Sequence, residues 1–295
     1  MTARSHLDPA VAETMAEGKE ARIARLKSIP YIPTLPGIKA LEWLSFFRRT
    51  ETESVRPRCL QIVGPSNVGK SALLSHYFRL CSTGSRNQNG YRACPVILVE
   101  APHDSSPRHL GDRIIAACLG NPVAYKRGEA PDRVEHVLRS SGVEQLLIDE
   151  LGNLPLRGRL RSQQDLGLLR RLCNLGITLG VATTKNLQMV MTADEQLASR
   201  FHPVFLPKWS ESEDLRSFLA AIEAYLPLPE PSFLDRVEIV RWLICNSRIS
   251  TGDILNTLRD ATLRAILEDA PFLTIDLLQR VVASTSPPDG RTFGR

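Results

Sequence analysis

The chain has 295 residues, 43% hydrophobic and 23% charged, with a formal net charge of +5 and a sequence pI near 9.0. This composition supports a sizeable core. No stretch approaches the roughly 18 to 20 uninterrupted apolar residues that span a bilayer, and the first residues lack the apolar segment of a signal peptide. We therefore expect a cytoplasmic protein. The basic balance fits a polyanionic partner such as DNA without establishing one.

The first fifty residues predict a leader and a connector. A charged, helix-prone stretch covers 10–27 and ends near Pro30, and three prolines between Pro30 and Pro36 require an extended connector. A short amphipathic helix is predicted over 37–49.

Five short apolar runs follow, and each is separated from the next by helical material. Continuous rather than alternating apolar character indicates strands covered on both faces, as in a parallel sheet flanked by helices. The predicted strands are 59–63, 96–99, 146–148, 177–182 and 204–206, and the predicted helices are 70–80, 108–119, 132–140 and 163–175. The pattern predicts a doubly wound α/β domain with a parallel five-stranded sheet.

The character changes after the proline-rich segment that ends at Pro231. No strand candidate remains, and 233–245, 251–268 and 274–283 have helical periodicity. We expect a small all-helical lid, with the proline-rich segment as its hinge. The predicted domains are 1–50 (leader and connector), 51–226 (α/β domain), 227–284 (lid) and 285–295 (disordered tail).

The segment Gly64–Ser71 matches the phosphate-loop pattern G-x-x-x-x-G-K-[ST], between a predicted strand and a predicted helix. In that setting the backbone N–H groups and the helix N-terminus bind phosphates. Lys70 would bridge the β- and γ-phosphates, and the Ser71 hydroxyl would ligate Mg²⁺. We expect ATP as the ligand, held by Gly64, Pro65, Ser66, Asn67, Val68, Gly69, Lys70, Ser71 and Ala72.

Two adjacent acids, Asp149 and Glu150, end the third predicted strand. We expect Asp149 to hold Mg²⁺ through water and Glu150 to polarise the attacking water. A strand end capped by solvated acids is the plain alternative, but the phosphate loop earlier in the chain favours the catalytic interpretation.

Two further positions are candidates for hydrolysis. Thr183, with Thr184 as second choice, stands at the tip of a strand that we expect to lie between the phosphate-loop and carboxylate strands, where it would contact the γ-phosphate; these threonines could instead be turn residues. Arg200 precedes the fifth strand and would reach the nucleotide of a neighbouring subunit. It could instead be a surface arginine that pairs with Asp194 or Glu195.

With these elements in order, the chain resembles the TniB/TnsC family of transposition ATPases, a branch of the AAA+ superfamily. The resemblance runs from about residue 31 to about residue 267. The segments that carry it are Val63–Ser71, Leu147–Asn153, Gly180–Thr183, Gln196–Phe201 and Leu206–Trp209. The resemblance implies ATP-dependent loading onto duplex DNA, assembly as a ring or helical filament, and a link between a TniQ-type target selector and a DDE transposase.

Two departures from the family pattern affect the site. Many AAA+ proteins place a sensor arginine in the lid, whereas Thr251–Leu255 has the corresponding turn without one, with Arg248 and Arg259 on either side. Relatives often have histidine after the carboxylates, and this chain has Gly152.

Basic residues concentrate in loops on the surface expected to face DNA. Few aromatic residues accompany them, so we expect contacts to the phosphate backbone that do not read sequence. Each of these residues could instead be a solvated surface charge. The candidates are Arg108, Lys126, Arg127, Arg157, Arg159 and Arg161.

Two other functions remain open from the sequence. One is a helicase loader or replication initiator of similar build, although about 60 residues of lid leave little room for a helix-turn-helix domain. The other is a mainly structural filament protein that is held together by ATP and turns it over slowly.

Overall fold

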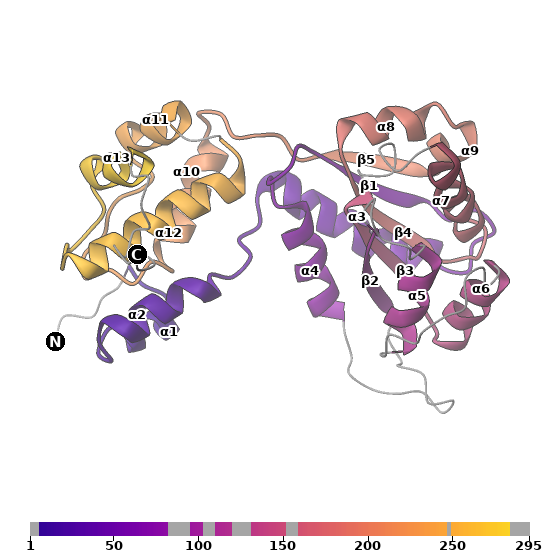
Figure 1. The fold of residues 1–295 in the computed structure, drawn as a ribbon, viewed down its shortest axis with the longest axis horizontal. Coiled ribbons are helices and arrows are strands. Elements are labelled where there is room, and N and C mark those ends of the chain that lie inside the picture. Colours follow the sequence, from indigo (N-terminus) through magenta and orange to yellow (C-terminus); the bar gives the residue numbers. More distant parts are fainter. Residues whose placement is uncertain are drawn as a thin grey trace, which may run out of the picture. The chain divides into compact units, whose positions relative to one another are not determined.

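A five-stranded parallel sheet organises residues 35–207 of the computed structural model (Figure 1). The structure describes residues 6–81, 95–102, 110–119, 131–151, 159–246 and 249–283, without the side chains of 131 and 159–165. The strands are β1 (Cys59–Val63), β2 (Val96–Glu100), β3 (Gln145–Asp149), β4 (Thr178–Thr183) and β5 (Phe201–Phe205). Their order is β2-β3-β4-β1-β5, and every neighbouring pair is parallel.

This topology confirms the predicted fold class and the predicted position of β4 between β1 and β3. The fifth strand begins at Phe201 rather than at 204. Only Phe201 and Val204 are buried in it, because β5 lies at the sheet edge and pairs only with β1, where Pro203 is tolerated. Such a partly exposed edge strand gives only a short continuous apolar run in the sequence.

Helices cover both faces of the sheet, which explains the apolar strands. On one face lie α3 (Leu35–Glu51) and α4 (Lys70–Cys81). The other face packs against α5 (Leu110–Leu119), α6 (Pro131–Ser140), α7 (Arg159–Leu172), α8 (Lys185–Thr192) and α9 (Glu195–Ala198). Figure 1 shows α3 and α4 on one side of the strands and α5, α6 and α7 on the other.

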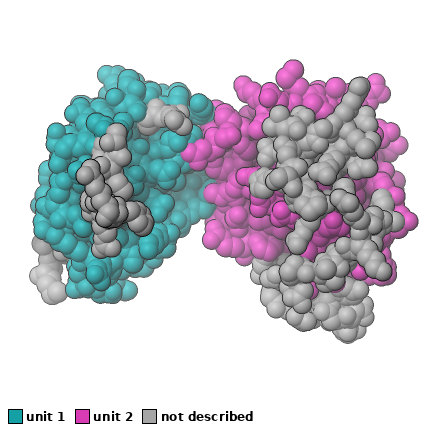
Figure 2. Space-filling model, in the orientation of Figure 1, with its two compact units in different colours: residues 1–34, 208–295 teal, residues 35–207 magenta. Residues whose placement is uncertain are grey.

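The remaining residues, 1–34 and 208–295, form a second unit, coloured teal in Figure 2. Its helices are α10 (Glu213–Glu223), α11 (Val237–Asn246), α12 (Thr251–Leu267) and α13 (Ile275–Ala283), with α1 (Pro9–Thr14), α2 (Lys19–Arg25) and the 3-10 turn η1 (Leu26–Ser28). Their buried leucine, isoleucine and alanine side chains form a core of their own.

The units divide the chain at other points than the predicted domains. The leader packs on the C-terminal helices: Arg22 Nε donates to the Pro227 carbonyl oxygen at 2.9 Å, and Leu26 is buried in their core. The leader is also not one continuous helix: α1 ends at Thr14, and Gly18, with a φ of 99°, directly precedes α2. The predicted tail lies outside the described residues.

The proline-rich segment is not a hinge between the two units, contrary to expectation. Leu226 and Leu228 are buried in the core of the helical unit, and α10 joins that core through Leu215, Phe218 and Ile222. The units instead divide at Leu35 and Lys208. The composition of the sequence identified the proline cluster but did not predict that Leu226 and Leu228 would bury it against the helical core.

Candidate functional site

The loop from Gly64 to Gly69 joins the end of β1 to the start of α4, as the motif requires. Lys70 is the first residue of α4, and its Nζ donates to the carbonyl oxygens of Gly64 at 2.8 Å and Pro65 at 2.5 Å. Asn67 and Gly69 have positive φ values of 66° and 96°. The left-handed backbone at both positions turns the loop around the lysine ammonium group.

Gly64, the first residue of this loop, lies close to the backbone of Leu206. A Cβ atom there would come within 2.6 Å of the Leu206 carbonyl oxygen and 2.9 Å of Val68 Cγ2, so only glycine fits without a shift. Gly64 N donates to the Thr183 carbonyl oxygen at 3.1 Å, and Leu206 N donates to the Val63 carbonyl oxygen at 2.8 Å. The last residue of β4 and the residue after β5 therefore hold the start of the loop.

The two acids lie at the same edge of the sheet as the loop. Asp149 ends β3, and Glu150 follows with a left-handed φ of 55°. Glu150 N donates to Asp149 Oδ1 at 2.8 Å, and Ala101 N donates to the Asp149 carbonyl oxygen at 2.8 Å. This turn leaves the Glu150 side chain exposed while the Asp149 side chain is half-buried.

Charge links the acids to the lysine. Burial lowers the pKa of the Lys70 ammonium group, and the negative charges of Asp149 and Glu150 oppose that shift. Such mutual influence requires the three side chains to be near one another. The structure therefore brings the predicted phosphate-binding and water-activating residues together.

The donor set fits Mg²⁺ held jointly by the protein and a nucleotide. Ser71 offers an exposed hydroxyl at the start of α4, and Asp149 offers an oxygen, Oδ2, that accepts no hydrogen bond from the described part of the chain. Mg²⁺ prefers oxygen ligands and uses one or two from protein beside phosphate and water. Among described residues, no group of three or more His, Cys, Asp or Glu residues could hold a metal by itself.

Thr183 lies at the tip of β4, and its hydroxyl is engaged. The side chain is 1% exposed, and Gln61 Nε2 of β1 donates to Thr183 Oγ1 at 3.2 Å. Gln61 Nε2 also lies 3.3 Å from Met191 Sδ. Thr184 follows with a half-buried side chain that makes no capping hydrogen bond to α8. Sequence reasoning missed Gln61; its only signal was a glutamine inside an apolar strand.

Arg200 lies at the opposite, amino edge of the sheet. Its carbonyl oxygen accepts from Cys59 N, at the start of β1, at 2.8 Å. Its guanidinium donates to the Cys173 carbonyl oxygen and, at 2.7 Å, to Asn174 Oδ1. In the structure Arg200 therefore pairs with neither Asp194 nor Glu195, and Asp194 instead accepts from Arg170 Nε at 2.8 Å.

Most of the candidate DNA contacts fall outside the described part of the chain. Arg108, Lys126, Arg127 and Arg157 lie outside the described residues, as do Gly152 and Arg248. Arg159 and Arg161 lie in α7, but their side chains are not described. Their predicted roles remain predictions.

In the part of the chain that the structure describes, no helix is long and apolar enough to cross a membrane.

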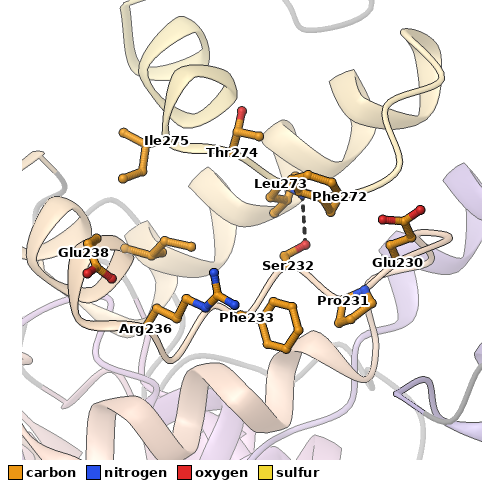
Figure 3. Close-up of a pocket in the computed structure, with 11 residues that line it drawn as sticks. Glu230, Pro231, Ser232, Phe233, Arg236, Glu238, Phe272, Leu273, Thr274 and Ile275 are labelled. Atoms are coloured by element: carbon orange, nitrogen blue, oxygen red, sulfur yellow. Dashed lines mark hydrogen bonds between the residues drawn. The ribbon is translucent and has the colours of Figure 1, made fainter.

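The helical unit contains a cavity of about 420 Å³ near the start of α13 (Figure 3). Phe233, Phe272 and Pro231 give it largely apolar walls, and the Arg236 guanidinium lies 4.3 Å from the centre of the Phe233 ring. The dashed line in Figure 3 is the bond from Leu273 N to Ser232 Oγ, 2.9 Å long. This cavity contains none of the residues predicted to bind nucleotide.

Comparison with protein families identifies the family to which this sequence is similar. The family model described as "Bacterial TniB protein" matches residues 22–211, which is more than half of the chain. The matched range includes the phosphate loop, both carboxylates, Thr183 and Arg200. No curated protein matches significantly.

Solved structures share the fold at low sequence identity. The Aeropyrum pernix ORC2 protein, in ADPNP-ADP complexes, has a TM-score of 0.61 and 16% identity, over 88% of this chain and 70% of that chain. Drosophila ORC bound to DNA has a TM-score of 0.58 and 15% identity, over 90% of this chain and 65% of that chain. AMPPCP-bound DnaA from Aquifex aeolicus has a TM-score of 0.51 and 17% identity, over 88% of this chain and 68% of that chain. The chain thus spans about two thirds of the length of these chains, and its fold is that of AAA+ proteins.

Proposed function

We propose that this chain, which belongs to the TniB family, is an ATPase that works on duplex DNA. The observation that carries the ATPase proposal is that Lys70, Asp149 and Glu150 all lie at the carboxyl edge of the sheet, near enough for the two acids to raise the pKa of the lysine. A phosphate loop alone would support nucleotide binding. The adjacent exposed Glu150 adds a group able to take a proton from water.

Each residue has a distinct task in this proposal. The backbone of the Gly64–Ser71 loop and Lys70 bind the phosphates of ATP, and Lys70 exchanges its bonds to Gly64 and Pro65 for phosphate oxygens. Ser71 and Asp149 would hold Mg²⁺, which when bound neutralises charge on the phosphate oxygens.

Hydrolysis then needs a positioned water and a base. Water attacks the γ-phosphorus, its proton passes to Glu150, and the bond to the β–γ bridging oxygen breaks with the electron pair leaving on ADP. Thr183 orients the water or the γ-phosphate, and Gln61 orients Thr183. Arg200 serves a neighbouring copy, because its place at the amino edge separates it from its own loop.

Family membership supports a role in transposition. In this proposal the chain assembles on target DNA with ATP and connects a TniQ-type selector to a DDE transposase. Arg108, Lys126, Arg127 and the basic residues 157–161 would contact DNA phosphates. Neutralising Arg108, Lys126 and Arg127 together should weaken binding to every duplex sequence and flatten its salt dependence by about one unit for each phosphate that is no longer bound.

The decisive test compares wild type with Lys70→Ala. Wild type should hydrolyse ATP faster with duplex DNA than without it, and Lys70→Ala should lose ATP binding in calorimetry, since no other cation among the described loop residues can replace its contact. ATP affinity within a few fold of wild type would contradict the assignment. Slow turnover unaffected by DNA would instead favour a structural filament.

A further inference from the structure

A cavity of about 580 Å³ lies at the amino edge of the sheet, away from the phosphate loop. Arg56 and Arg58 line it from the segment before β1, Asn174 from the turn after α7, and Arg200 from the turn before β5. Its walls therefore carry three arginines and no acidic side chain. A site of this composition favours a phosphorylated ligand.

Backbone hydrogen bonds hold the walls together. Glu53 N donates to the Gly176 carbonyl oxygen at 2.7 Å, and Cys59 N donates to the Arg200 carbonyl oxygen at 2.8 Å. The first bond brings the segment before β1 against the turn after α7, where a Cβ atom on Gly176 would lie 3.3 Å from Glu53 Cα. The arginines consequently come from segments that are fixed relative to one another.

The three arginines differ in how their charge is compensated. Arg58 donates through Nε to Glu51 Oε1 at 2.7 Å, so its charge is already paired. Arg200 donates only to the neutral oxygens of Cys173 and Asn174. Arg56 is exposed and makes no hydrogen bond or ion pair with another residue that the structure describes. Two cations, Arg56 and Arg200, thus remain without an acidic partner among the described residues.

The chain's own ATP cannot occupy this cavity. β1 separates it from the phosphate loop, and the strand's five residues span roughly 16 Å at about 3.3 Å per residue. Val55, on the rim, is 86% exposed and offers apolar surface that a second molecule could cover. The phosphate must therefore come from another molecule.

Building on the ATPase function proposed above, we propose that Arg56 is a second cation that acts between subunits. Together with Arg200, it binds the terminal phosphates of ATP held in the Gly64–Ser71 loop of a neighbouring copy. Arg200 is positioned by its bond to Asn174, whereas Arg56 is unrestrained and becomes ordered on the incoming phosphate. The pair would offset negative charge that develops during hydrolysis and make nucleotide binding strengthen self-association.

The test uses Arg56→Ala in the full chain. Arg49→Ala is the control, because Arg49 is an exposed arginine of α3 in the same unit but outside the cavity. Dilute Arg56→Ala protein should bind ATP as wild type does. Its self-association in the presence of a non-hydrolysable ATP analogue, measured by sedimentation, should weaken about tenfold. The kcat of the assembled protein should also fall by about tenfold, which is less than the 100- to 1,000-fold loss expected when a fully aligned donor is removed. Arg49→Ala should match wild type in all three measurements.

Mixing identifies the subunit in which Arg56 acts. Arg56→Ala combined with Glu150→Gln protein should regain part of the missing activity, since some interfaces then join an intact Arg56 to an intact Glu150. Placing both substitutions on one chain removes this recovery.

Three results would overturn the inference. Unchanged self-association and kcat in Arg56→Ala would exclude the role. Weakened duplex binding with a flatter salt slope, at normal analogue-driven assembly, would assign the cavity to DNA phosphates. Loss of ATP affinity in the dilute protein would place Arg56 in its own subunit's site. The proposed function fails separately, if wild type itself neither binds nor hydrolyses ATP.

Discussion

The Leu206 carbonyl oxygen lies so close to Gly64 that a Cβ atom on Gly64 would come within 2.6 Å of it. Leu206 follows β5, and Gly64 opens the phosphate loop, so this contact couples the edge strand to the loop. The same leucine begins the segment Leu206–Trp209, which carries part of the family resemblance.

Gly64→Ala should therefore disturb the protein locally. The added methyl group must displace backbone at 206 or the Val68 side chain, and overpacking of this kind costs about 1–3 kcal/mol of unfolding free energy. Chemical denaturation should show that loss, and calorimetry should show weaker ATP binding. Gly167→Ala is the control, because a Cβ atom there meets nothing within 4 Å and helix α7 should gain about 0.5–1 kcal/mol. Equal stability of the two variants would contradict the close contact.

Glu150→Gln should separate ATP binding from hydrolysis. The amide keeps the shape of the side chain but cannot accept the proton from water, so turnover should fall by roughly 100-fold or more. ATP affinity should stay within a few fold of wild type, and DNA-bound assemblies should last longer. Glu144→Gln, just before the other end of β3, is the matched control and should hydrolyse ATP normally. Normal turnover by Glu150→Gln would remove Glu150 as the base.

Thr183→Val should reduce hydrolysis about tenfold with ATP affinity retained, as expected for a group that orients a reactant. It should also lower the unfolding free energy by about 1 kcal/mol, because the buried Gln61 amide loses its oxygen acceptor. Thr183→Ser keeps the hydroxyl and should preserve both properties. If Thr184→Val lost activity while Thr183→Val did not, Thr184 would be the threonine that contacts phosphate.

The sequence predicted the sheet and the loop because both depend on local features. Buried parallel strands require continuous apolar runs, and the phosphate loop requires glycines at fixed spacing. The parallel direction of β1, β4 and β3 then placed Asp149 and the loop at one edge. The missed features depend on packing between distant segments. Gln61 matters only because β4 lies beside β1, and the leader joins the C-terminal helices only through contacts such as that of Arg22 with Pro227.

The last prediction concerns Arg200, which lies at the amino edge of the sheet, with the length of β1 between it and the loop of its own chain. A cation so placed can act on ATP only across an interface. Specific activity should consequently rise with protein concentration or with DNA that gathers subunits. Arg200→Ala should bind ATP but lose that cooperative activity, since the missing charge acts mainly on the transition state.

Mixed assemblies provide the sharpest measurement. When Arg200→Ala is combined with Glu150→Gln, some interfaces pair an intact arginine with an intact base, and part of the activity should return. A chain that carries both substitutions should give no such recovery, which controls for simple co-assembly. If activity stayed absent although the mixed assemblies formed, Arg200 would act in its own subunit or only support the turn at Cys173 and Asn174. The unfolding free energy of Arg200→Ala then decides between these two roles, because removing a purely structural arginine would lower that free energy.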